Sequence, residues 1–196
     1  GNQQLQVFTD ADWAGCKDTR KSTSGGCVSH GDHTPKCWSK TQGPLALSSG
    51  ESELCAVVKA TSEGFGLQSL MHDLGRKVDG HIWADASAAL GIINRKGLGK
   101  LRHIQTSHLW VQDVAATRAM EYHKILGTDN PADLFTKYLD YATIEKHCKT
   151  LRCIFEDGRA ETALAVVAPM VGNFREVMNL AKGATEATPR DMEWWL

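Results

Sequence analysis

Short apolar runs open the chain, and turn-forming residues separate them. The first run contains Leu5, Val7 and Phe8 and ends at two acidic residues. The second and third runs cover residues 23–30 and 35–41, with Gly, Asp and Pro in the breaks between them. Runs of this length, divided in this way, predict three strands in an antiparallel meander.

A helical period begins after Ser48. The apolar side chains then recur three or four residues apart, as one face of a helix requires, at Leu54, Val57, Val58, Thr61 and Phe65. Ser48 has the character of an N-cap, and Gly75 that of a C-cap. Glu51 and Glu53 fall on opposite flanks of the apolar stripe, so the period alone does not decide which of them faces the core edge.

The next part of the chain alternates between strand and helix patterns. We expect strands near residues 80–85 and 120–126, and helices near 87–95, 106–120 and 132–137. An α/β fold is predicted by this order of elements, which is three strands, a helix, a strand, helices, a strand and a helix. Its five-stranded mixed sheet would join the antiparallel meander to two parallel strands, with helices packed on it.

The end of the chain has a different character. Asn173 and Glu176 have the spacing of a capping box before a short amphipathic pattern, and no catalytic constellation is present there. We therefore expect one domain over residues 1–140 and a C-terminal helical extension of unassigned role over 141–196. Because the chain begins with Gly1 and enters a strand almost at once, we interpret it as a piece of a longer polypeptide.

Composition narrows the class of protein. The net charge is −1 and 42% of the residues are hydrophobic, as in a globular chain. Any binding of nucleic acid must therefore come from local basic patches. No apolar run approaches the roughly 20 residues that span a bilayer, and no signal segment opens the chain. The six cysteines form no C-x-x-C pair, which favours reduced thiols inside a cell.

Acidic residues follow the predicted strands at the points where they end. Asp10 and Asp12 follow the first strand, Asp85 ends the fourth, and Asp133 opens the last helix. We expect Asp10, Asp85 and Asp133 to converge where two parallel strand ends meet a helix start. Carboxylates brought together repel one another unless they bind hard divalent cations such as Mg²⁺. Two such ions can assist hydrolysis of a phosphodiester, which makes a phosphodiester hydrolase the natural class.

Seven segments of the chain together resemble one known family, the ribonuclease H domain at the end of the Pol polyprotein of copia-type LTR retrotransposons. The resemblance covers roughly residues 4–140, and the segments occur in the family's order. They are TDADWAG (9–15), RKSTSG (20–25), CWSKTQ (37–42), ALSSGESEL (46–54), WADASAAL (83–90), RHIQTSH (102–108) and NPADLFTK (130–137).

The resemblance implies an activity and a site. Ribonucleases H cut the RNA strand of an RNA–DNA hybrid with two Mg²⁺ ions, which Mn²⁺ can replace. The matching positions make Asp10, Glu53, Asp85 and Asp133 the catalytic and metal-binding residues, and thus select Glu53 over Glu51. The resemblance also implies a reverse transcriptase domain as a partner, no membrane, and an intracellular setting in cytoplasmic retroelement particles or the nucleus.

Further residues are candidates for contact with the hybrid. They are small, basic or imidazole side chains at positions that match the family or lie on basic segments: Ser22, Thr23, Ser24, Lys40, Lys100, Arg102, His103 and His108. Ala86 and Gln105 depart from the Asn and Asp that the family usually carries. The alternative to an active nuclease is a catalytically silent or domesticated nucleic-acid-binding domain of the same fold.

Overall fold

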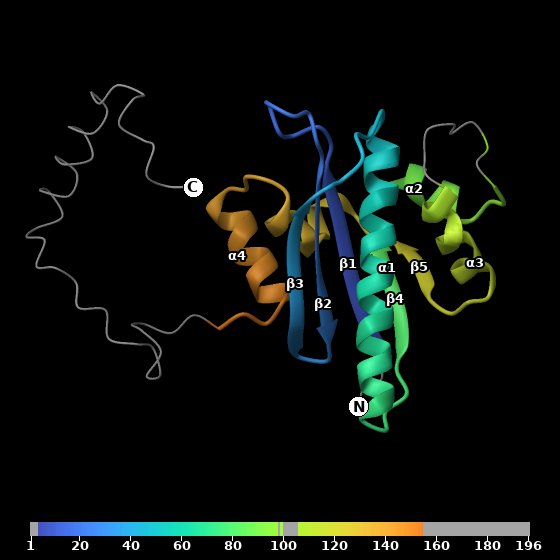
Figure 1. The fold of residues 1–196 in the computed structure, drawn as a ribbon. Coiled ribbons are helices and arrows are strands. Elements are labelled where there is room, and N and C mark those ends of the chain that lie inside the picture. Colours follow the sequence, from blue (N-terminus) through green and yellow to red (C-terminus); the bar gives the residue numbers. More distant parts are fainter. Residues whose placement is uncertain (1–3, 98, 100–105, 155–196) are drawn as a thin grey trace, which may run out of the picture. The chain divides into compact units, whose positions relative to one another are not determined.

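A five-stranded mixed sheet forms the centre of the protein (Figure 1). The computed structural model describes residues 4–97, 99 and 106–154. Its strands run in the order β3-β2-β1-β4-β5, with β1–β2 and β2–β3 antiparallel and β1–β4 and β4–β5 parallel. This confirms the predicted meander with two added parallel strands. The bounds are β1 (Gln4–Asp12), β2 (Thr23–His30), β3 (His33–Thr41), β4 (Asp79–Ala84) and β5 (Glu121–Lys124).

Helices account for most of the other described residues. The α-helices are α1 (Ser49–Asp73), α2 (Ser87–Ile93), α3 (Trp110–Ala116) and α4 (Tyr141–Thr150). The 3₁₀ helices are η1 (Thr106–Leu109), η2 (Gly127–Asp129) and η3 (Pro131–Phe135). The single helix expected over 106–120 is therefore η1 followed by α3. The helix expected over 132–137 is the 3₁₀ helix η3. The helix expected after Asn173 lies outside the described residues.

Helix α1 packs its apolar stripe onto one face of the sheet (Figure 1). Leu54, Val57 and Ala60 are fully buried, and they share a core with Val7 and Ile82 from the central strands. Burying each such side chain contributes roughly 1.5–3 kcal/mol. The Ser48 hydroxyl accepts a hydrogen bond from the Glu51 N–H at 3.3 Å, which confirms the predicted cap.

Helix α4 lies within the predicted C-terminal extension and contacts the sheet domain. The Thr34 hydroxyl of β3 donates to the carbonyl oxygen of Leu151, just after α4, at 2.9 Å. Lys146 of α4 donates to the Thr128 carbonyl at 2.7 Å, and its neighbour His147 is 1% exposed. None of the described helices is long and apolar enough to cross a membrane.

Two adjacent glycines allow close packing in the middle of the sheet. A Cβ atom built on Gly25 would lie 2.6 Å from Thr136 Cγ2, and one on Gly26 would lie 2.3 Å from the Trp38 ring and 2.5 Å from the Phe8 carbonyl oxygen. The sheet's register shift is elsewhere, between Val28 and His30. The Gly-Gly pair therefore marks a close approach rather than a bulge, and at Gly25 it brings η3 against β2.

We expect Gly26→Ala to destabilise the protein by about 1–3 kcal/mol, because the added methyl overlaps a ring and a backbone oxygen. The matched control is Gly66→Ala in α1, where nothing lies within 4 Å of an added Cβ. That change should stabilise the helix by about 0.5–1 kcal/mol. Urea unfolding followed by circular dichroism measures both, and effects of the same sign would contradict this account of Gly26.

Candidate functional site

Two parallel strands bring the first two carboxylates of the site together. Strands β1 and β4 pair in register up to Thr9 and Ala84. The residues that follow this pair are Asp10, still in β1, and Asp85, directly after the end of β4. Asp10 is 1% exposed, whereas Asp85 is half-buried. A Cβ atom built on Gly127 would lie 3.2 Å from Asp85 Oδ2, so a residue without a side chain leaves room for this carboxylate.

Asn130 positions the third carboxylate. Its side-chain oxygen accepts a hydrogen bond from the Ala132 N–H at 3.2 Å and so caps η3, with Pro131 in the first turn. Its side-chain amide donates to the Thr9 carbonyl oxygen at 3.0 Å. Thr9 is the neighbour of Asp10, so the buried Asn130 fastens η3, and with it Asp133, to the end of β1.

The three aspartates form one cluster. Asp10, Asp85 and Asp133 each offer a carboxylate oxygen, and the three oxygens lie within 4.8 Å of one another. The Lys137 ammonium donates to Asp10 Oδ1 at 3.1 Å and to Asp133 Oδ1 at 2.8 Å. The Thr136 hydroxyl donates to Asp10 Oδ2. The convergence expected from the sequence is therefore present in the fold.

Glu51 and Glu53, in the first turns of α1, have different structural roles. Glu51 turns back on the helix start, where its Oε2 accepts from the Leu47 N–H at 2.7 Å. Glu53 lies next to β1, where its carboxyl is hydrogen-bonded to the backbone of Ala11 and feels the charges of Asp10 and Asp85, although it is not part of the 4.8 Å cluster. Its Oε2 is buried without a hydrogen-bond partner among the described residues. The geometry thus separates two residues that helical periodicity could not.

Burial, assisted by neighbouring acidic groups, raises the pKa values of three of the site's carboxyls. Burial, and then the charges of Asp10 and Asp85, raise the pKa of Glu53 to about 8. Burial and the charge of Asp10 also raise the pKa of Asp85, and burial raises that of Asp133. For Lys137, burial acts to lower the pKa, but the hydrogen bond to Asp133 and the charge of Asp10 outweigh it and raise the pKa.

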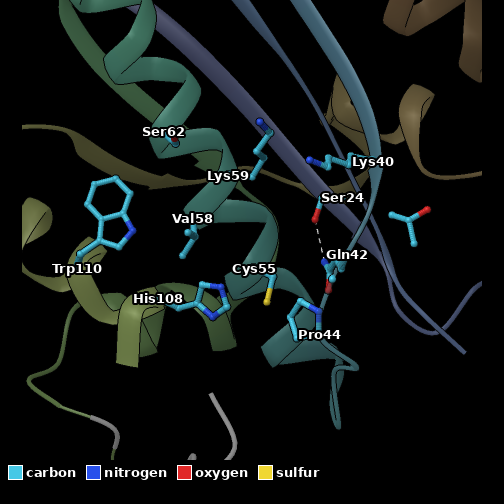
Figure 2. A pocket seen from close by; sticks show the side chains of 12 residues that line it. Ser24, Lys40, Gln42, Pro44, Cys55, Val58, Lys59, Ser62, His108 and Trp110 are labelled. Carbon is cyan, nitrogen blue, oxygen red and sulfur yellow. Dashed lines mark hydrogen bonds between the residues drawn. The ribbon is translucent and has the colours of Figure 1, made fainter. Parts of the chain in front are cut away.

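A pocket of about 350 Å³ lies over the outer side of α1, on the helix that carries Glu53 (Figure 2). Cys55, Val58 and Lys59 of α1 lie between Ser24 and Lys40 on one side and His108 and Trp110 on the other (Figure 2). Three of the predicted substrate-contact residues, Ser24, Lys40 and His108, therefore line one cavity. Burial lowers the pKa of His108.

Gln42 joins the wall of this pocket to the acidic site. Its side-chain amide donates to the Ser24 hydroxyl at 2.8 Å (Figure 2) and to the Ser52 carbonyl oxygen at 2.9 Å. Ser52 directly precedes Glu53 on α1. The end of β3, strand β2 and the first turns of α1 are thus held as one unit.

The other predicted substrate-contact residues have different positions. Ser22 is fully buried, and its hydroxyl accepts a hydrogen bond from the Ala14 N–H at 3.0 Å. Thr23 lines a second hollow beside η3, together with Thr136 and Lys137. The remaining three, Lys100, Arg102 and His103, lie outside the described residues.

The sequence reasoning did not single out Asn130, Thr136 and Lys137 as site residues. For Asn130 a signal was present, because Asn before Pro is a helix-start pattern, here placed three residues before an acidic side chain. For Thr136 and Lys137 the sequence alone carries no signal, since their contact with Asp10 depends on how η3 lies against β1.

Several curated relatives of this chain are transposon proteins. Over 149 residues, 75% of this chain, it is 29% identical to the retrovirus-related Pol polyprotein from transposon TNT 1-94 of Nicotiana tabacum. Over 138 residues, 69% of this chain, it is 30% identical to the Pol polyprotein from transposon RE1 of Arabidopsis thaliana. Both relatives are retrovirus-related Pol polyproteins from copia-type transposons. The chain spans only 11% and 9% of those two relatives' length.

No protein-family model matches the chain. Among solved structures, it is similar to LC11-RNase H1, isolated from compost by a metagenomic approach. The two are 12% identical, the match covers 68% of this chain and 93% of that chain, and the TM-score is 0.47.

The raised pKa of Glu53 predicts a pH-dependent stability in metal-free protein. A carboxyl whose pKa rises from 4.5 to about 8 on folding favours the folded state when protonated. This contribution is present below about pH 4.5 and is lost as the pH rises to about 8. Glu53→Gln keeps the neutral form, so in EDTA it should match the natural chain near pH 4.5 and exceed its stability by about 2–4 kcal/mol at pH 8.

Urea unfolding at a series of pH values measures this difference. Glu51→Gln is the control, because it removes the same charge at the helix start, keeps an oxygen that can accept from the Leu47 N–H and leaves the acidic cluster unchanged. It should give no gain at pH 8. An equal gain in the free energy of unfolding for both variants would contradict the raised pKa of Glu53. A gain for Glu53→Gln that does not change with pH would contradict it as well.

Proposed function

We propose that this domain is a magnesium-dependent ribonuclease H that hydrolyses the RNA strand of RNA–DNA hybrids. Asp10, Glu53, Asp85 and Asp133 are the proposed metal-binding and catalytic residues, and two Mg²⁺ ions, replaceable by Mn²⁺, the proposed cofactor. The single observation that carries the proposal is the convergence of three carboxylates from β1, β4 and η3 within 4.8 Å, with Glu53 of α1 beside them.

The donor set fits a hard divalent cation. All four side chains offer carboxylate oxygens, which Mg²⁺ prefers, and no imidazole or thiol belongs to this cluster among the described residues. The buried, unpartnered Oε2 of Glu53 is an acceptor that the protein itself leaves unused. Leaving a buried polar oxygen unpaired is costly, whether or not the carboxyl is protonated, and a bound cation would relieve that cost.

Divalent ions bound here would activate a water and stabilise the leaving oxygen of a phosphodiester. The chain's own contribution is to hold the carboxylates in place. Asn130 fixes Asp133 against β1, and Thr136 holds one oxygen of Asp10. The Lys137 ammonium offsets negative charge between Asp10 and Asp133, and it lies on the rim of the site, where an anionic phosphate would approach.

The pocket on α1 supports the proposed path of the hybrid. Lys40 is an exposed cation at one side of the cavity, and His108 and the indole of Trp110 lie at the other (Figure 2). A backbone phosphate suits the ammonium, and sugar edges suit the partly apolar walls. Contact with the 2′-hydroxyl across the minor groove would distinguish RNA from DNA. Lys100, Arg102 and His103 remain proposed contacts of the same substrate.

We place this activity within a Pol polyprotein. The curated relatives are about nine or more times longer than the matched segment, since the match covers 11% and 9% of them. A domain of this kind would act together with a reverse transcriptase on the hybrid that reverse transcription produces.

Asp10→Asn and Asp85→Asn should each abolish metal-dependent cutting of the RNA strand, with a loss of about a hundredfold or more. Each change removes a charged oxygen that holds a cation worth several kcal/mol of transition-state stabilisation. A gel assay on an end-labelled RNA–DNA hybrid measures the cut, and EDTA should stop it in the natural chain.

Glu51→Gln is the control for that assay, since Glu51 is two residues from Glu53 and serves the helix start. It should cut at the natural rate. Hybrid binding without any cutting by the natural chain would support the silent binding domain instead. Equal cutting of duplex DNA would contradict the assignment to RNA–DNA hybrids.

Lys40→Gln should weaken hybrid binding and lower the slope of log affinity against log salt by about 1, because one phosphate contact is lost. Lys77→Gln is the matched control. Lys77 is also exposed, but it lies in the loop after the far end of α1. Fluorescence anisotropy at several salt concentrations measures both slopes, and equal slopes for the two variants would exclude the pocket as the binding path.

A further inference from the structure

A second group of ligand-type side chains lies on the sheet face away from α1. Along β4 the residues Gly80, Ile82 and Ala84 are buried, so the intervening His81 and Trp83 point to the opposite face. On β5, the Tyr122 hydroxyl contacts Thr61 of α1 at 3.1 Å. Its two neighbours, Glu121 and His123, therefore share the face of His81.

The parallel register of β4 and the edge strand β5 brings three of these side chains together. His81 pairs with Glu121, and Trp83 pairs with His123. The distance from His81 Nδ1 to His123 Nε2 is 2.9 Å, and each of these nitrogens lies 3.5 Å from Glu121 Oε2. Two imidazole nitrogens and one carboxylate oxygen thus surround a single point, all within 4.8 Å of one another.

These spacings match the size of a transition-metal ion. Ligands about 2.0–2.1 Å from one zinc ion, at a tetrahedral angle, lie about 3.3–3.4 Å apart. The two nitrogen-to-carboxylate distances of 3.5 Å exceed this range by about 0.1 Å. The nitrogen-to-nitrogen distance of 2.9 Å falls short of it by less than 0.5 Å. In the metal-free protein the 2.9 Å contact is a hydrogen bond between the two imidazoles. A bound ion would replace that hydrogen bond and separate the two nitrogens by about 0.4 Å more.

The rings are already held in place. Trp83 stacks on His123 with ring centroids 4.6 Å apart, and the two histidine rings stack at 5.1 Å. The Trp83 N–H donates to Gln6 of β1. The His81 side chain is 13% exposed and that of Glu121 is 55% exposed, so the group opens to solvent on the carboxylate side. A metal ion can enter there and keep water or another ligand at its free positions.

We propose that His81, Glu121 and His123 form a second metal site, which takes a transition metal such as Zn²⁺. Imidazole nitrogens favour zinc, copper, nickel or iron, whereas carboxylate oxygens alone favour magnesium. The site is separate from the aspartate cluster. His81 precedes Asp85 by four residues on β4, about 13 Å along a strand. The ion would connect β4 to the edge strand β5 and so stabilise the end of the sheet.

Cobalt is a suitable spectroscopic probe, because Co²⁺ substitutes for Zn²⁺ and absorbs visible light in a way that depends on its ligands. The full 196-residue chain, kept reduced, is titrated with Co²⁺ in an excess of Mg²⁺. We expect one ion per chain with visible absorption bands, and displacement of this ion by Zn²⁺. Zn²⁺ should also raise the melting temperature.

Three variants test the ligands one by one. His81→Gln, His123→Gln and Glu121→Gln should each weaken Co²⁺ binding by tenfold or more and remove the Zn²⁺-dependent rise in melting temperature. Glu121→Gln changes a mostly exposed side chain, so it tests the site even if a histidine variant folds poorly. The matched control is His72→Gln, an exposed histidine near the end of α1, which should bind Co²⁺ as the natural chain does.

The same experiment separates this site from others in the chain. Asp85→Asn should leave the visible bands unchanged, because it alters only the aspartate cluster. Loss of the bands in Asp85→Asn, undiminished binding in all three ligand variants, or a near-ultraviolet thiolate charge-transfer band in place of imidazole ligation would each overturn the proposal. The result is independent of whether the chain cuts RNA.

Discussion

Mutual repulsion between four acidic side chains is the constraint on which the site depends. Asp10 and Asp133 are nearly buried, and Glu53 has a buried oxygen without a partner among the described residues. Such an arrangement costs free energy in the metal-free chain, and the fold sustains it through rigid neighbours. The hydrogen-bonded register of β1 and β4, the cap on η3 and the first turns of α1 each hold one carboxylate against the others.

Lys137 shows how the metal-free protein tolerates this crowding. Its ammonium lies within 3.1 Å of one oxygen of Asp10 and 2.8 Å of one of Asp133. Since its pKa is raised, it keeps its charge at any ordinary pH. The side chain of Lys137 is still 38% exposed, so it can turn toward solvent when a divalent ion takes over its role. The space between Asp10 and Asp133 thus needs a cation, which is either the Lys137 ammonium or an ion from solvent.

Much of the fold could be predicted from the sequence, because its local signals agree with one another. The run from Leu5 to Phe8, the cap at Ser48 and the acidic strand ends each indicated an element that the structure contains. The boundary between η1 and α3 could not be predicted, since a 3₁₀ turn and an α-helix share the same apolar spacing over so few residues. Thr136 and Lys137 reach Asp10 only through the tertiary packing of η3.

The choice between Glu51 and Glu53 shows the limit of periodicity most clearly. Both stand in the first turns of α1, and both could lean over an edge of the core. In the structure, Glu51 satisfies the Leu47 N–H at the helix start, and Glu53 turns to the strand ends. Local sequence explains the first role as helix capping. The second depends on where β1 and β4 end, and therefore only family resemblance or coordinates could indicate it.

Alternation of side chains along β4 and β5 then gives the two faces of one sheet different metal-binding chemistries. The oxygen ligands gather where β1 and β4 end, beneath η3, where burial and like charge favour a hard cation. The imidazoles project from the middle of β4 and β5 onto the opposite face, where Trp83 holds one of them by stacking. A strand that turns Ile82 inward toward α1 must turn His81 outward. The periodicity that builds the core therefore also keeps the two groups of ligands apart.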